Sequence, residues 1–410
     1  MPIVPTCHTL VHLAGEQALP VCIGAMQIRA EHHVVVASSR TKFIHKRLKD
    51  FLGPAGQVDD VLMVTNPFDP FETLAAMRAR FGEAPDNLIL NATGGTKPMF
   101  MGAYSYVAGD RARCFYVETS PERQLVWMGK GGFRSEPLRP AFETVSSLIQ
   151  AASGRRVTGS RPAEWITQRS ILTCWFWKRR TSLRSFYAQL HEFNSREFQN
   201  GLSNNGELLA FTFSYQDPAI GIEVELLATG DASVKLWDVG GARPLEASLI
   251  APDLFLYLTG GWLEDFVWLR LVGDGDAQIR GVEAGVAIAF EPSAGLYAGQ
   301  ETVQDLDVVF TDGYELFLIE CKAGQVRQED LQKLENNARA YGGSLAKGVL
   351  ASVQTPRAGT ALRKRIEESD TLRCFSNDSI NSDLPHKICL HLNQRIFSPR
   401  QAIRTDSSRT

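Results

Sequence analysis

The amino-acid sequence predicts a mixed α/β protein with two folded domains joined by a connecting region. Strand and helix patterns alternate over the first third of the chain, which favours a mostly parallel sheet with helices on both faces. A strand hairpin followed by alternating helices and strands forms a second α/β pattern nearer the C-terminus. Between them, residues 129–162 are rich in Gly, Pro, Arg and Ser, which is typical of a connector.

The composition restricts the classes of protein. The chain has 410 residues, a net charge of −3 and seven cysteines without a CxxC pair. The small charge excludes a strong basic field over the whole molecule, so any site for a polyanion must be a local patch. The cysteine pattern argues against a disulfide framework or a cysteine zinc site and indicates a reducing cytoplasm. The N-terminus lacks a signal-peptide pattern and no run reaches about 18 apolar residues, so we expect no membrane span.

In the first domain, the sequence predicts strands at 8–14, 33–39, 88–93 and 113–119, and helices at 41–52, at 69–81 and after residue 97. The start of one helix carries a specific signal. Asp69, Pro70 and Glu72 read as an N-cap, a first-turn proline and a reciprocal capping glutamate.

In the rest of the chain, the sequence predicts helices at 169–193, 262–272, 327–341 and 356–368, and strands within 211–230 and at 280–291, 303–324 and 347–353. The predicted divisions of the chain are a first domain at 1–145, a connector and intermediate region at 146–258, a second domain at 259–398 and a flexible tail at 399–410.

Residues 173–187 mix aromatic and basic side chains. The basic ones are Lys178, Arg179, Arg180 and Arg184. Such a mixture suits a single-stranded nucleic acid, whose backbone attracts cations and whose bases stack on aromatic rings. The alternative, which we favour, is a helix that buries Trp175, Phe176 and Trp177 and keeps its basic face in solvent.

Residues 303–324 read VQDLDVVFTDGYELFLIECKAG, two apolar strands joined at Asp312-Gly313, the preferred two-residue hairpin turn. Side chains alternate between the faces of a strand, and this turn sets residue 307 opposite 318 and residue 305 opposite 320. Four charged side chains then project from one face, toward one end of it: Asp305, Asp307, Glu320 and Lys322. The other face is apolar and belongs to a core. A slip of one residue in the register would separate the charges.

Converging carboxylates repel one another and are costly to remove from water, unless a divalent cation lies between them. A lysine beside such a cation can position or deprotonate a water molecule and offset charge on a phosphoryl transition state. The pattern therefore indicates metal-dependent phosphodiester hydrolysis. A structural ion pair at the rim of the sheet is the alternative interpretation.

Asp307 and the triplet Glu320-Cys321-Lys322 resemble the core of the PD-(D/E)xK nucleases, over about residues 260–370. The resemblance implies a restriction-endonuclease-like α/β domain that uses Mn²⁺ or Mg²⁺. The metal ligands that it implies are Asp307, Glu320, the Cys321 carbonyl and, from the preceding helix, Glu264. Lys322 would position or activate water, with Asp305 beside the ligands and Gln325 helping to place water or phosphate. The first motif reads QDLD instead of Pro-Asp, a variation common in the group.

Residues 88–99 read LILNATGGTKPM, a strand, a Gly-Gly turn and the start of a helix. Backbone amides at such a junction face an anion, and the helix N-terminus adds positive potential. Neither the P-loop pattern nor the dinucleotide fingerprint GxGxxG is present. A phosphate site and a tight turn that needs glycine for backbone reasons are both consistent with this pattern.

This segment, together with HLAGEQALP at 12–20 and VVVASSRTK at 34–42, resembles the three ligand-facing segments of the CRISPR-associated Rossmann-fold (CARF) domain, over residues 5–145. The resemblance implies a Rossmann-like fold and a cyclic oligoadenylate, usually the tetramer, bound across a two-fold homodimer. One departure is Val21 after Pro20, where the family often has Asn. The ligand-facing residues that it implies are Gln17, Ser38, Ser39, Thr93, Gly94, Gly95, Thr96 and Lys97.

A CARF domain followed by a PD-(D/E)xK domain resembles the ancillary nucleases of type III CRISPR immunity. The resemblance implies a cytoplasmic, ligand-gated and metal-dependent endonuclease that cuts single-stranded DNA or RNA in antiviral defence. Two other functions stay open. One is an ungated restriction or repair DNA endonuclease whose first domain only dimerises. The other is a non-catalytic nucleotide sensor that binds nucleic acid through its middle region, although the intact Asp307, Glu320 and Lys322 argue against it.

Overall fold

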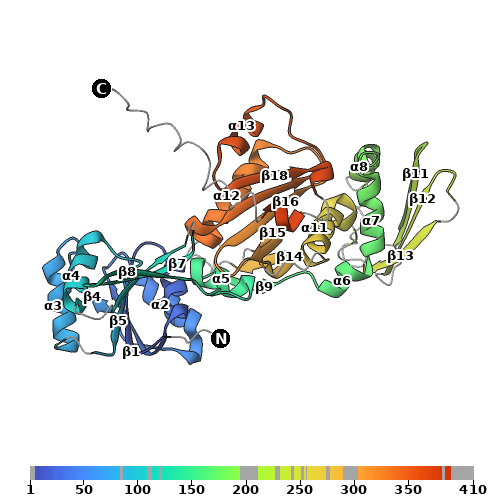
Figure 1. Cartoon of the computed structure of the whole chain (residues 1–410). Coiled ribbons are helices and arrows are strands. Elements are labelled where there is room, and N and C mark those ends of the chain that lie inside the picture. Colours follow the sequence, from blue (N-terminus) through green and yellow to red (C-terminus); the bar gives the residue numbers. More distant parts are fainter. Residues whose placement is uncertain are drawn as a thin grey trace, which may run out of the picture.

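The computed structural model of the chain describes residues 5–83, 86–108, 113–119, 122–193, 211–226, 231–241, 244–250, 254, 256–273, 278–289, 303–380 and 384–388. Figure 1 shows an N-terminal domain in blue and cyan, a C-terminal domain in orange, and a small antiparallel sheet in yellow-green at the far end of the molecule. No helix in the described ranges has both the length and the apolar character needed to cross a bilayer.

The N-terminal domain is built on an eight-stranded sheet with the order β3-β2-β1-β5-β6-β7-β8, in which β4 also pairs with β2. The pairings from β3 to β6 are parallel, and β7 and β8 are antiparallel. The strands are β1 (Thr6–Leu13), β2 (Arg29–Ala37), β3 (Gln57–Val58), β4 (Leu62–Met63), β5 (Leu88–Asn91), β6 (Cys114–Glu118), β7 (Gln124–Gly129) and β8 (Gly132–Pro137). The helices are α1 (Leu19–Gln27), α2 (Phe43–Leu52), α3 (Pro70–Phe81) and α4 (Lys97–Val107).

Two local predictions in this domain need correction. Asp69 caps α3 by accepting the Phe71 N–H at 2.9 Å, but Glu72 does not complete a reciprocal capping pair. Its carboxylate instead accepts the N–H of Asn66 at 2.8 Å, in the preceding loop. The Gly-rich start of the predicted connector is also part of the fold, because Gly129 pairs with Gly132 across a two-residue hairpin turn.

The C-terminal domain has a six-stranded sheet with the order β18-β17-β16-β15-β14-β9. The pairings from β16 through β15 and β14 to β9 are antiparallel, and β16, β17 and β18 run parallel to one another. The strands are β9 (Arg156–Gly159), β14 (Arg280–Ala289), β15 (Val303–Thr311), β16 (Leu316–Lys322), β17 (Lys347–Ser352) and β18 (Leu372–Ser376). The helices are α11 (Trp262–Gly273), α12 (Gln328–Gly342) and α13 (Ala361–Glu368). Short helical turns are η1 (Gly53–Ala55), η3 (Tyr257–Gly261), η4 (Gly343–Leu345) and η5 (Asn377–Ser379).

The region between the two domains consists of several structural pieces. Helix α5 (Val145–Ser153) packs between α2 and α12, and β9 joins the sheet of the C-terminal domain. Helices α6 (Ala163–Gln168), α7 (Ser170–Arg179) and α8 (Arg184–Phe193) follow, and Figure 1 shows α7 and α8 between the C-terminal domain and the small sheet. The strands of the small sheet are β10 (Phe211–Gln216), β11 (Ile220–Leu226), β12 (Asp231–Asp238) and β13 (Leu245–Ile250).

The aromatic residues of α7 belong to a core, as the favoured interpretation predicted. Trp175 and Phe176 are buried, and Trp177 stacks on Phe266 of α11 with ring centroids 4.2 Å apart. This packing fixes α7 and the small sheet to the C-terminal domain through burial of large rings.

Candidate active site

The hairpin between β15 and β16 has a four-residue loop, so the predicted two-residue turn is wrong. Thr311 pairs with Leu316, and Val308 pairs with Ile319. The loop closes because the Asp312 carboxylate accepts the N–H groups of residues 314 and 315, at 3.0 and 2.9 Å. The register differs from the predicted one by two residues, which preserves the alternation of faces.

The charged face of the hairpin therefore forms, with different neighbours. Continuing the observed register by one pair sets Asp307 directly opposite Glu320. Asp305 pairs instead with Ala287 on the other side of β15, and its side chain is exposed. The predicted Asp305–Glu320 pairing is wrong.

Asp307, Glu320 and Lys322 lie together at the end of this hairpin. One oxygen of Asp307 accepts the Cys321 N–H at 2.7 Å. The Lys322 Nζ lies 2.8 Å from Glu320 Oε1 and 3.3 Å from Asp330 Oδ1, in the first turn of α12. Glu320 is only 4% exposed, so its carboxylate is stabilised by contacts within the protein, such as that with Lys322, and not by water.

Glu264 of α11 completes what we call the acid cluster, which consists of Glu264, Asp307, Glu320 and Lys322. Its Oε2 accepts a hydrogen bond from Arg161 at 2.9 Å. Arg161 also binds the fully buried Asp265 at 2.6 Å, so one guanidinium holds the two adjacent acids at the start of the helix. This arrangement fixes the direction in which Glu264 faces.

The carboxylates of the cluster influence one another's pKa values. Burial, followed by the charge of Asp307, raises the pKa of Glu264 to about 8. Burial, followed by the charge of Glu320, raises the pKa of Asp307 to about 6, although the Cys321 N–H opposes the shift. Burial alone would lower the pKa of Lys322, but its hydrogen bond to Glu320 and the surrounding acids raise it, so the ammonium stays charged.

The chemistry of this donor set fits a hard divalent cation. A raised carboxyl pKa means that nearby positive charge does not compensate for burial and for the neighbouring acids. A bound cation would supply that compensation. Oxygen ligands from Glu264, Asp307 and Glu320 match the preference of Mg²⁺ and Mn²⁺. The residues present are therefore suited to hold such an ion, together with the carbonyl of Cys321, the residue after Glu320.

Three residues of the site were missed by the sequence analysis. Lys333 lies 3.2 Å from Glu320 Oε1, and Asp330 contacts Lys322. Asp330 and Lys333 are one helical turn apart on α12, beside its apolar stripe. This spacing was the sequence signal that could have identified them as neighbours. Arg161 lies in the region interpreted as a connector, where nothing in the sequence marks it as a partner of Glu264.

The three segments implied to face a ligand meet at one edge of the N-terminal sheet. They follow β1, β2 and β5, which are parallel neighbours with β1 in the middle. The connection after β1 leads to β2 on one side of it, whereas β5 lies on the other side. Ligands of open α/β sheets bind where the strand order changes direction in this way. The structure therefore brings these segments together, as predicted.

Within the glycine loop, several residues also have structural roles. A Cβ at Gly94 would lie 2.1 Å from the Leu13 carbonyl oxygen, so only glycine allows the two loops to approach. The Thr93 hydroxyl donates to Asn91 at 2.6 Å and accepts the Val117 N–H at 3.0 Å. Thr96 caps α4 by accepting the Met99 N–H at 3.2 Å.

The other implied ligand residues differ in exposure. Ser39 and Lys97 are exposed at this edge, and Gly95 has a φ of +79°, which favours glycine. Ser38 is buried, with its hydroxyl 3.3 Å from that of Thr41. Gln17 is exposed, but its side-chain oxygen accepts a hydrogen bond from the Ser344 hydroxyl in the C-terminal domain.

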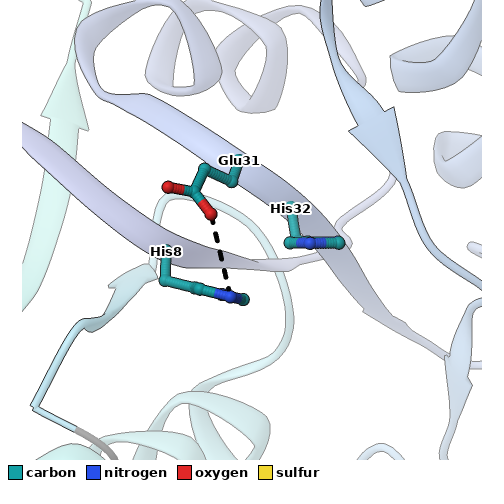
Figure 2. A group of neighbouring side chains, drawn as sticks. All are labelled: His8, Glu31 and His32. Atoms are coloured by element: carbon teal, nitrogen blue, oxygen red, sulfur yellow. Dashed lines mark ion pairs between the residues drawn. The ribbon is translucent and has the colours of Figure 1, made fainter.

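Two groups of histidines occur on β1 and β2. His12 and His33 are buried, 3.0 Å apart, and Asn91 lies 3.0 Å from the other ring nitrogen of His12. His8, Glu31 and His32 form a more exposed group, drawn in Figure 2, whose possible metal-binding atoms all lie within 4.8 Å of one another. This second group belongs to β1 and β2 and is separate from the acid cluster.

Comparison with known proteins agrees with this two-domain arrangement. The Card1 CARF domain family matches residues 9–129, and the Card1-like endonuclease domain family matches residues 254–373. None of the curated proteins matches the chain.

Two solved structures share the fold over nearly the whole chain. Protein VC1899 from Vibrio cholerae is 18% identical, with a TM-score of 0.69, and the match covers 93% of this chain and 97% of that one. Can2 from Sulfobacillus thermosulfidooxidans, solved in complex with cyclic tetra-adenylate, is 19% identical, with a TM-score of 0.63 and coverage of 94% and 99%. The chain thus belongs to the proteins in which a CARF domain of the Card1 type precedes a Card1-like endonuclease domain.

Proposed function

We propose that this protein is a metal-dependent nuclease that a cyclic oligoadenylate switches on, with single-stranded DNA or RNA as its substrate. The observation that carries the proposal is the meeting of Glu264, Asp307, Glu320 and Lys322 in one partly buried cluster of the endonuclease domain. The ring ligand is proposed to be cyclic tetra-adenylate, the ligand present in the solved structure of Can2.

At the acid cluster, the residues divide the chemistry. Glu264, Asp307, Glu320 and the Cys321 carbonyl would hold Mn²⁺ or Mg²⁺, which supplies Lewis-acid chemistry for phosphodiester hydrolysis. The charged Lys322 ammonium is placed by Glu320 and offsets negative charge that develops on the phosphoryl group. Because its pKa is raised, Lys322 acts in this proposal by orienting water and by its charge, not as the base.

Gating is supported by a physical connection between the two domains. Gln17, in the first ligand-facing loop, binds Ser344 directly after α12. At the other end of α12, Lys333 and Asp330 contact Glu320 and Lys322. A helix of 15 residues, about 22 Å long, therefore joins the ligand loop to the acid cluster.

A cleft of about 720 Å³ accompanies this connection, between the first loop and α12. Its lining includes Glu16, Gln17, Glu335, Arg339 and Ser344. The contact between Gln17 and Ser344 therefore lies at the edge of an open cleft. Ring binding would shift the population toward an arrangement in which the cluster engages a strand.

The proposal includes a cytoplasmic homodimer that acts in type III CRISPR antiviral defence. The two-fold arrangement follows from the ring ligand, since a symmetric ring is matched by each loop supplied twice. Sedimentation of the protein with and without the ring tests this part.

A cleavage assay tests the activity. Purified protein with Mn²⁺ is offered labelled single-stranded DNA, single-stranded RNA and duplex DNA, with and without cyclic tetra-adenylate. We expect cutting of a single strand only when the ring is present. Cutting without the ring would replace the proposal with an ungated nuclease. Ring binding without any cutting would replace it with a nucleotide-sensing regulator.

A further inference from the structure

A polar groove of about 590 Å³ lies where α8 of the middle region meets the endonuclease domain. Its polar lining residues include Arg184, Gln325, Gln328, Gln354, Thr355 and Arg357. No carboxylate belongs to the lining among the residues that the structure describes, whereas the cleft beside Gln17 is lined by Glu16 and Glu335. The groove is therefore suited to a negatively charged ligand.

The groove begins next to Lys322 of the acid cluster. Gln325 follows Lys322 by three residues in the loop after β16. The Val353 N–H donates to the Lys322 carbonyl oxygen at 3.0 Å, and Gln354 comes directly after Val353. Gln328 begins α12, the helix whose first turn carries Asp330, the partner of Lys322. Two lining segments, 325–328 and 354–357, thus lie next to the lysine of the proposed reaction.

The two arginines of the groove are available to a ligand. Arg184 and Arg357 are exposed, and neither has a carboxylate partner within the described part of the chain. The neighbouring arginines of the basic stretch are occupied: Arg179 binds Asp238, and Arg180 binds Asn377. Arg184 is therefore positioned differently from the rest of that stretch.

The backbone adds to the field of the two arginines. Arg184 is the first residue of α8, Gln328 is the first of α12, and Ala361 is the first of α13. All three line the groove, so the N-termini of three helices, where the backbone carries partial positive charge, lie at it.

We propose that this polar groove binds the part of a single-stranded DNA or RNA substrate that lies next to the cleaved phosphate. Arg184 and Arg357 bind backbone phosphates, and the glutamine amides bind the edges of unpaired bases. The Watson–Crick edges of the bases are free for such hydrogen bonds in a single strand but are occupied in a paired duplex. The inference rests on the proposed nuclease function and assigns a substrate-binding role to α8.

The test is a binding measurement on the full chain carrying Arg184→Glu together with Arg357→Glu. Fluorescence anisotropy follows labelled single-stranded DNA, single-stranded RNA and duplex DNA over a range of salt concentrations, with EDTA present. We expect single-strand affinity to fall at least tenfold. The slope of log affinity against log salt should decrease by about 1.4, since each phosphate contact on a single strand contributes about 0.7.

The matched control reverses two exposed charges outside the groove, Arg134→Glu together with Lys46→Glu. It gives the same change in net charge and should keep its affinity within about twofold. A second variant, Arg184→Lys with Arg357→Lys, should retain most of the binding because the positive charge is kept.

Three results would overturn the proposal. They are unchanged binding by the groove variant, an equal loss in the control, and an equal loss for duplex DNA. A loss for DNA alone or RNA alone supports the groove and identifies the strand that it takes. Because EDTA prevents cutting, the result is independent of the proposed cleavage. Each binding curve is measured with and without cyclic tetra-adenylate, so a loss caused by the groove variant is distinguished from a dependence on the ring.

Discussion

The side chain of Gln17 accepts a hydrogen bond from the Ser344 hydroxyl, so the first loop of the CARF domain touches the turn that ends α12. At the opposite end of the same helix, Lys333 contacts Glu320 of the acid cluster. A residue implied to face a ring ligand thus lies at the interface with the endonuclease domain. Binding and cutting can therefore be separated by variants along this connection.

Ser344→Ala should weaken the coupling between ring binding and cutting. The variant removes the hydroxyl that donates a hydrogen bond to Gln17, but it leaves the ligand-facing loops intact. One hydrogen bond contributes about 1 kcal/mol, so the ratio of ring-saturated to ring-free cutting rates should fall by about fivefold. Steady-state cleavage at saturating and zero ring concentration measures this ratio.

The control for this prediction is Ser369→Ala, which removes a hydroxyl from another part of the same cleft. It should leave the ratio unchanged, because Ser369 bonds locally, to Thr371 and Leu372. An unchanged ratio in Ser344→Ala as well would show that α12 does not carry the signal.

Lys322→Ala should abolish cutting, by at least about 100-fold, because it removes the positive charge placed beside the reacting phosphoryl group. Ring binding should stay within about twofold of the unmodified protein, since Lys322 lies in the other domain. Single-turnover cleavage and titration with a labelled ring measure the two effects. Lys364→Ala, at an exposed position on α13, is the control. Cutting at the normal rate would show that the site assignment is wrong.

Asp307→Asn should increase stability while it removes activity. Burial and the charge of Glu320 raise the pKa of Asp307 to about 6, so its charge at pH 7 costs the folded protein stability relative to the unfolded chain. A neutral amide removes this repulsion and still offers an oxygen to the Cys321 N–H. The unfolding midpoint in EDTA should rise by a few degrees, corresponding to about 2 kcal/mol.

Added Mn²⁺ should reverse this order, since it stabilises the unmodified protein more than the variant. Asp305→Asn is the matched control, because Asp305 is exposed on the same strand and should change neither midpoint. If Asp307→Asn lowers the midpoint in EDTA, the carboxylate is stabilised by its surroundings and the repulsion argument fails.

The sequence predicted the acid cluster because side chains alternate between the two faces of a strand. An error of two residues in the hairpin register leaves each side chain on the same face. The hairpin loop has four residues instead of two, and this shift of two keeps Asp307, Glu320 and Lys322 on one face. Tertiary contacts that local patterns do not encode also hold this loop. Arg123 of the N-terminal domain binds Asp312, and the Gly313 carbonyl accepts the Ala141 N–H.

Long-range partners were beyond the sequence patterns for the same reason. Arg161 lies 103 positions from Glu264, and Ser344 lies 327 positions from Gln17, so no local periodicity connects them. Arg184 illustrates an intermediate case. The sequence shows that it lies among basic and aromatic residues. Only the folded structure shows that Arg184 lines a groove, whereas Arg179 binds an acidic partner.

The buried pair His12 and His33 should make the CARF domain sensitive to acid. Burial, followed by the charge of His32, lowers the pKa of His33 to about 4, and burial also lowers the pKa of His12. In the unfolded chain both would titrate near 6.5. Between about pH 6.5 and 4 the unfolded chain therefore binds more protons. Stability is complete above 6.5 and is lost as the pH falls, by about 3 kcal/mol for His33.

Hydrogen exchange of the β1 and β2 amides, measured from pH 7 to pH 4 after correction for the intrinsic rate, should report this loss. His33→Asn should reduce the dependence on pH by about one proton, because one buried imidazole no longer has to stay neutral. His8→Asn removes an exposed histidine of the same strand pair and should keep the full dependence. Asn91 contacts His12 and accepts a hydrogen bond from Thr93 in the glycine loop, so His12 helps to position this loop. Ring binding should therefore weaken over the same pH range. A stability that is independent of pH in this range would mean that the two histidines are solvated or become charged without cost.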